Sequence, residues 1–123
     1  DGYTAAWEEV LAPLITRQQP GVTVLRDYHA ENIMLLNGKA TAPQGLIDFQ
    51  DALVGHPAYD LVSLLQDARR DVSVDLETAM LVHYAGVMGG VGDDFLADYA
   101  TLGAQRNAKI VGIFTRLDRR DGK

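Results

Sequence analysis

The stretch "VLRDYHAENIMLL", residues Val24–Leu36, places a crowded polar segment between two apolar runs. The apolar runs are typical of neighbouring strands in one small sheet. A tight hairpin between them would need only a two-residue turn such as Asn-Gly. The segment instead holds the carboxylates of Asp27 and Glu31 together with an Arg, a His and an Asn. Such a loop predicts a chemical site rather than a simple reversal of chain direction.

Short apolar runs around this loop predict three strands, at Val22–Arg26, Asn32–Leu36 and Gly45–Phe49. The segments "NGK" and "TAPQ" provide the turn between the second and third strands. Strands this short and this close in sequence predict one local three-stranded ribbon, which is too small to be the sheet of an α/β domain.

Helical periodicity predicts one helix before the strands and three after them. The expected ranges are Thr4–Gln18, a helix that starts at Pro57, Val74–Met88, and a long helix from Asp93 or Asp94. The apolar stripe of the last helix contains one charged residue, Arg106. This order of elements predicts an α+β fold, mostly helical, with a small β ribbon that carries the polar loops.

The composition is that of a single globular domain. The 123 residues are 47% hydrophobic and 23% charged, which is enough for one core. The net charge of −6 argues against a nucleic-acid partner. No apolar run is long enough to cross a bilayer, no signal peptide is visible, and there is no cysteine. We therefore expect a cytoplasmic protein that binds neither nucleic acid nor membrane.

Asp27 and Asn32 form the frame D-x-x-x-x-N, and Asp48 follows at the end of an apolar strand. Phosphoryl transfer needs positioning and charge neutralisation more than covalent chemistry. Asp27, on a loop after a strand, can orient an acceptor hydroxyl and take its proton. Mg²⁺ prefers oxygen ligands, which Asn32 and Asp48 offer. A ribbon that brings the two loops together therefore predicts a metal–phosphate site.

The segments "LRDYHAEN" and "LIDFQDALVGHPAYDLVSLLQD" resemble the catalytic core of the aminoglycoside phosphotransferase and choline kinase family, which shares the protein-kinase fold. That family has a His-Gly-Asp-x-x-x-x-Asn loop, an Asp-Phe metal motif and a Pro-x-x-Asp-Leu helix. The resemblance implies that Asp27 is the catalytic carboxylate and that Asn32 and Asp48 hold Mg²⁺. It also implies that Asp60 accepts hydrogen bonds from the loop backbone. It covers the chain from Val24 onward.

Two departures from the family pattern are visible. Leu25 and Arg26 stand where most members have His-Gly, and Gln50 stands where protein kinases have Gly. With the later segment "QRNAKIVGIF", the residues look most similar to bacterial anomeric kinases of N-acetylmuramate and N-acetylglucosamine, which serve peptidoglycan recycling. The resemblance implies ATP and Mg²⁺ as cofactors and a small amino sugar as substrate. An aminoglycoside or choline-type acceptor is the alternative, because an acidic chain suits a cation.

The sequence has no Gly-rich phosphate loop and no strand lysine of the kind that clamps ATP in this family. It begins at Asp1 without Met. We expect residues 1–123 to form part of a C-terminal lobe, with the ATP-clamping N-terminal lobe absent. Such a fragment is expected to be inactive and to self-associate through exposed apolar surface. A non-catalytic binding or assembly module is the other interpretation.

Four further polar residues have open or secondary roles. His29 matches the second histidine of the family loop, where support of the loop is favoured over proton transfer. Glu31 faces either the sugar or solvent. Asp51 touches a second metal or the substrate, or only caps its loop. Arg106 on an apolar stripe favours an internal ion pair, because an unpaired buried charge is costly; recognition of a polar group on the sugar is the alternative.

Overall fold

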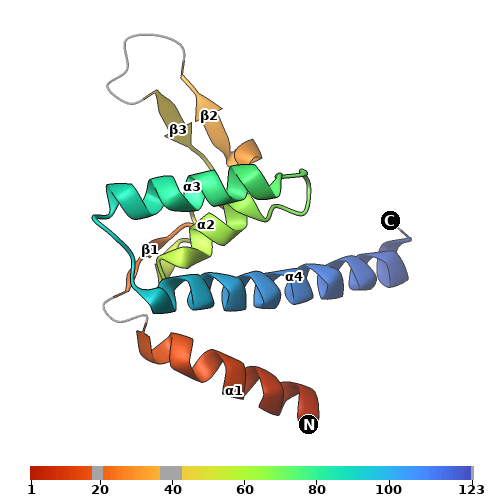
Figure 1. The fold of residues 1–123 in the computed structure, drawn as a ribbon. Helices are drawn as coiled ribbons and strands as arrows, with labels where there is room; N and C mark the ends of the chain where they lie inside the picture. Colours follow the sequence, from red (N-terminus) through yellow and green to blue (C-terminus); the bar gives the residue numbers. More distant parts are fainter. Residues whose placement is uncertain (18–20, 37–42, 123) are drawn as a thin grey trace. The chain divides into compact units, whose positions relative to one another are not determined.

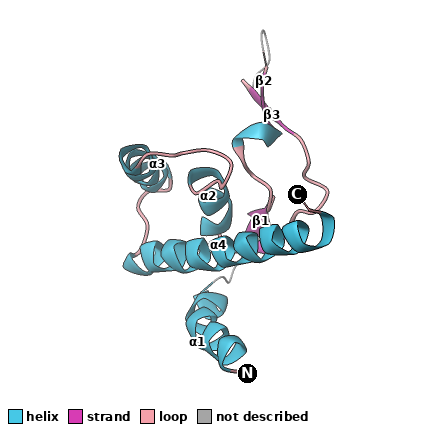
Figure 2. Cartoon of the chain, turned by 90° about the vertical axis from the view of Figure 1, so that its right-hand side faces the viewer, coloured by secondary structure: helices cyan, strands magenta, loops and turns pink. Residues whose placement is uncertain are grey.

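The computed structural model describes residues 1–17, 21–36 and 43–122. In chain order the elements are α1 (Gly2–Arg17), β1 (Val22–Val24), the 3₁₀ helix η1 (Ala30–Asn32), β2 (Ile33–Leu35), β3 (Gln44–Leu46), β4 (Leu53–Gly55), α2 (Ala58–Leu65), α3 (Val74–Val87) and α4 (Asp93–Asp121). Helices make up most of the chain and the strands are short (Figure 2). The predicted α+β class is confirmed.

The chain divides into two compact units, Asp1–Asp67 and Ala68–Lys123. The first contains α1, the strands and α2, and the second contains α3 and the long α4 (Figure 1). None of the helices in the described part of the chain combines the length and apolar character that a bilayer crossing requires.

The strands form two separate antiparallel pairs, so the predicted three-stranded ribbon is wrong. In one pair β1 lies beside β4, with Thr23 opposite Val54. In the other, β2 lies beside β3, with Met34 opposite Gly45 (Figure 1). The fourth strand, β4, was not predicted.

The predicted strands are longer than the observed ones because the backbone turns at their polar ends. The third strand was expected to reach Phe49 but ends at Leu46. Asp48 has a φ of 59°, in the left-handed region that a continuous strand cannot contain. Likewise β1 ends at Val24, two residues before Arg26 with its φ of 70°. Asp27 and Asp48 therefore lie on loops rather than in strands.

Both polar loops cross from one pair of strands to the other. Residues 25–32 leave β1 and enter β2, and residues 47–52 leave β3 and enter β4. The Ile47 N–H donates to the Asn32 carbonyl at 3.1 Å, one step beyond the β2–β3 pairing. This contact holds the end of the first loop beside the start of the second.

Local polar contacts start the helices of the first unit. Asp1 Oδ1 accepts from the Thr4 N–H at 2.9 Å, so this aspartate caps α1. His56 Nδ1 accepts from the Ala58 N–H at 3.1 Å where α2 begins. The buried apolar side chains of this unit are Leu14, Val24, Ala58, Val62 and Leu65.

Aromatic contacts join α3 and α4 in the second unit. The Tyr99 hydroxyl donates to Glu77 Oε1 at 2.6 Å, and the rings of Tyr84 and Phe95 stack with centroids 5.5 Å apart. Burial raises the pKa of the Tyr84 phenol. Helix α4 starts at Asp93, as predicted.

Candidate active site

The loop after β1 is anchored by the first turn of α2. The two oxygens of the Asp60 carboxylate accept from the backbone N–H groups of Leu25 and Arg26, at 2.8 and 3.0 Å. The hydroxyl of Ser63, a fully buried residue one turn later, donates to the Arg26 carbonyl at 3.0 Å. Hydrogen bonds to a charged acceptor are stronger than neutral ones. These are the backbone contacts that the family resemblance implies for Asp60, while its part in activity stays a prediction.

The side-chain amide of Asn32 connects the two polar loops. Its Nδ2 donates to the backbone carbonyl of Asp27 at 2.9 Å and reaches Asp48 Oδ2 at 3.4 Å. The first contact closes the loop of residues 25–32 on itself, and the second, which is long for a hydrogen bond, reaches the loop of residues 47–52. The three residues of the D-x-x-x-x-N…D pattern are therefore brought together in one site.

His29 lies beneath this loop with only 6% of its surface exposed. Its Nε2 is 3.3 Å from Asn32 Nδ2. That amide nitrogen also faces two oxygen acceptors, so Nε2 is a third group with a lone pair beside it. Nδ1 is buried with no hydrogen-bond partner among the described residues. The support role of His29 stays a prediction.

Asp48 is held from its other side by a residue that the sequence interpretation missed. Gln50 Nε2 donates to Asp48 Oδ1 at 2.6 Å. The only sequence signal for it is the amide two positions after the aspartate in "DFQD". Ser63 was also missed, because a hydroxyl on an apolar helix stripe has no pattern that marks it.

The donor set of this site fits magnesium. Asn32 directs its nitrogen at Asp27 and Asp48, which leaves its Oδ1 as a neutral oxygen donor. Asp48 adds a carboxylate. Mg²⁺ is commonly held by one or two protein oxygens, with substrate phosphates and water completing the octahedron. No cluster of three or more His, Cys, Asp or Glu suited to a metal occurs in the part of the chain that the structure describes.

The remaining candidates differ in their surroundings. The Asp27 side chain is exposed, and so is Glu31 on η1. Asp51 is exposed in a turn closed by a 3.1 Å hydrogen bond from the Ala52 N–H to the Phe49 carbonyl. Arg106 belongs to the second unit, where it is buried on α4. The roles given to all four stay predictions.

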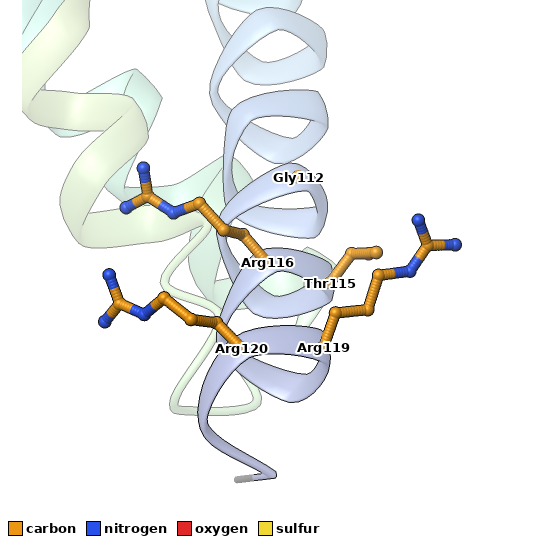
Figure 3. A pocket seen from close by; sticks show the side chains of 5 residues that line it. All are labelled: Gly112, Thr115, Arg116, Arg119 and Arg120. Carbon is orange, nitrogen blue, oxygen red and sulfur yellow. The ribbon is translucent and has the colours of Figure 1, made fainter.

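A separate pocket of about 490 Å³ lies on the C-terminal part of α4 (Figure 3). Its lining consists of Gly112, Thr115, Arg116, Arg119 and Arg120. Arg120 pairs with the adjacent Asp121 at 2.7 Å, which raises the pKa of the guanidinium and lowers the pKa of the carboxyl. The pocket includes none of the predicted site residues.

The chain is similar to known proteins along most of its length. Residues 2–101 match the model of the phosphotransferase enzyme family. The chain is 46% identical over 123 residues to an N-acetylmuramate/N-acetylglucosamine kinase of Caulobacter vibrioides, covering 97% of this chain and 34% of that protein. Proteins of the same name from Neisseria meningitidis and Pseudomonas aeruginosa are 38% and 36% identical, covering 94% and 100% of this chain and 35% and 38% of theirs. The chain thus spans about a third of the length of the curated relatives it matches.

Proposed function

Because the chain belongs to the phosphotransferase enzyme family, we propose that it forms part of the C-terminal lobe of an enzyme that phosphorylates a sugar hydroxyl with ATP and Mg²⁺. One observation carries the proposal: the Asn32 amide contacts both the Asp27 carbonyl and the Asp48 carboxylate. A base and two metal ligands need this proximity to act on one phosphoryl group.

Asp27 is the residue that would act on the acceptor. Its side chain is exposed, while its carbonyl and its neighbours are fixed by Asn32 and Asp60. An accessible carboxylate on a fixed backbone suits a group that must orient a hydroxyl and accept its proton. Asp60 and His29 would act through this backbone rather than on the substrate.

Asn32 Oδ1 and the Asp48 carboxylate would hold the metal. When bound, the magnesium complex of ATP supplies the transferable phosphoryl group with its charge neutralised. The protein's contribution is to keep the two ligands close, and the 3.4 Å contact between their side chains supports this.

We propose the anomeric hydroxyl of N-acetylmuramate or N-acetylglucosamine as the acceptor, in cell-wall recycling in the cytoplasm. The support is the name shared by the relatives, which are N-acetylmuramate/N-acetylglucosamine kinases. Residues 1–123 would lack the ATP-clamping lobe and would be inactive alone.

An acceptor screen on the full-length protein that carries this chain tests the proposal. ADP release is measured with ATP, Mg²⁺ and, in turn, N-acetylmuramate, N-acetylglucosamine, an aminoglycoside and choline. We expect turnover with the two amino sugars and a product phosphorylated at the anomeric carbon by NMR. Absence of turnover with both sugars would refute the proposed function. A preference for the aminoglycoside or choline would instead support a kinase of a cationic acceptor.

Replacement of the proposed base gives a second test. Asp27→Ala in the full-length protein is expected to lower kcat by about 10²–10⁴-fold, the usual contribution of a positioned proton acceptor. Asp71→Ala, at an exposed loop carboxylate, is the control and should keep the wild-type rate. Wild-type turnover by a folded Asp27→Ala variant would exclude Asp27 from catalysis.

A further inference from the structure

Gln50 is fixed so that its side chain reaches back to the proposed metal ligand. The turn of residues 49–52 is closed by the hydrogen bond between Ala52 N–H and the Phe49 carbonyl, which leaves Gln50 at the first central position. From there its Nε2 donates to Asp48 Oδ1 at 2.6 Å, slightly shorter than is usual for a hydrogen bond from a nitrogen to a carboxylate.

The Asp48 carboxylate is consequently held at both oxygens. Oδ1 accepts from Gln50, and Oδ2 faces Asn32 Nδ2 at 3.4 Å. Asp48 is exposed and has a left-handed backbone, so packing alone does little to fix its rotamer. Each carboxylate oxygen has two lone pairs, so both retain one for a cation while they accept these hydrogen bonds.

We propose that Gln50 is a positioning residue that orients the Asp48 carboxylate for the magnesium–nucleotide complex. The inference rests on the proposed function. A neutral amide suits the role better than a basic side chain, because a lysine or arginine would neutralise the carboxylate that the cation needs. A glycine, which protein kinases have at this position, would leave Oδ1 without this donor.

Partners that orient a metal ligand typically contribute 10–100-fold to metal affinity. Since this site is exposed to water, we expect Gln50→Ala to have an effect at the lower end of this range. In the full-length protein, the Kd of a non-hydrolysable ATP analogue in the presence of Mg²⁺ should rise about tenfold by calorimetry. The Kd of the same analogue in EDTA should not change. If Gln50→Ala lowers kcat, excess Mg²⁺ should restore it.

Gln44→Ala is the matched control. Gln44 is an exposed glutamine of β3 in the same unit, with no part in the site. If circular dichroism shows that Gln50→Ala is unfolded, the same titrations are made with Gln50→Met. This variant keeps the length of the side chain and lacks the donor. A wild-type Kd with Mg²⁺ in the folded variant overturns the role of Gln50.

The same titrations separate the two proposals. If Mg²⁺ does not tighten binding of the analogue to the wild-type protein, the proposed function fails. If Mg²⁺ tightens binding to the wild type and to Gln50→Ala equally, only the inference about Gln50 fails.

Discussion

Arg26 shows at the scale of one residue how the loop of residues 25–32 is shaped. Its φ of 70° lies in the left-handed region, which costs a residue with a Cβ about 1–2 kcal/mol. Hydrogen bonds from its N–H to Asp60 and from Ser63 to its carbonyl hold it there. Family members commonly have Gly at this position, which adopts the same φ without strain. With Arg at this position, the loop therefore contains a backbone strain that Gly would avoid.

The cost of the left-handed backbone is measurable by comparing two variants. Arg26→Gly and Arg26→Ala both remove the side chain and whatever it contacts, so their difference reports the backbone alone. We expect Arg26→Gly to have a free energy of unfolding about 1 kcal/mol larger than Arg26→Ala. Urea denaturation of the chain gives both values.

Arg70 provides the control for this pair. It is an exposed loop residue and is not among the described residues with positive φ. There the alanine variant should equal or exceed the glycine variant in stability, because glycine loses more entropy on folding. An alanine variant at position 26 that matches or exceeds the glycine variant would contradict the strained backbone.

At the scale of an element, α3 shows what a cap contributes to a helix without fully buried side chains. None of its side chains is buried, whereas α4 buries Tyr99 and Leu102. The first turn of α3 has its N–H groups exposed unless they are capped, and Ser73 Oγ accepts from the Leu76 N–H at 3.2 Å. This cap therefore adds to the stability that the contacts with Phe95 and Tyr99 give the helix.

Removal of this cap should be visible in stability. Ser73→Ala is expected to lower the free energy of unfolding by about 1 kcal/mol, measured by urea denaturation. Ser73→Asp keeps an acceptor at the same position, and its charge is favourable at a helix N-terminus, so it should retain wild-type stability or gain slightly. Equal losses in both variants would show that the hydroxyl does more than cap.

The β elements are too small to be stable by themselves. Each pair has three residues per strand, and an isolated two-stranded sheet is marginal in water. Contacts outside the strands, such as those of Asp60 and Asn32, must help to hold the pairs in place. The loops and the strands therefore stabilise one another.

Across the whole molecule, much apolar surface is exposed. Leu35 is 78% exposed, Val54 73% and Val87 71%. Monomeric proteins rarely leave large contiguous apolar patches uncovered. The relatives are about three times as long as this chain. We expect residues outside the chain to pack against these apolar side chains in a protein of that length.

We predict that residues 1–123 alone self-associate and have no detectable turnover. Size-exclusion chromatography with light scattering should give a mass above 13.4 kDa that rises with concentration. The full-length protein is the control and should show turnover under the same conditions. A concentration-independent monomer would contradict the association, and sugar phosphorylation by the isolated chain would contradict the need for a second lobe.

The sequence by itself determined the α+β class, the start of α4, the residue types of the site and the family. These depend on local periodicity and on side chains at fixed spacing, which are visible along the chain. Only the tertiary structure decided that β1 pairs with β4, because that pairing joins three-residue segments some thirty positions apart with no local signal. It also decided that Gln50 donates a hydrogen bond to Asp48. This contact depends on the left-handed backbone of Asp48 and on the turn that follows it, which residue type alone does not reveal.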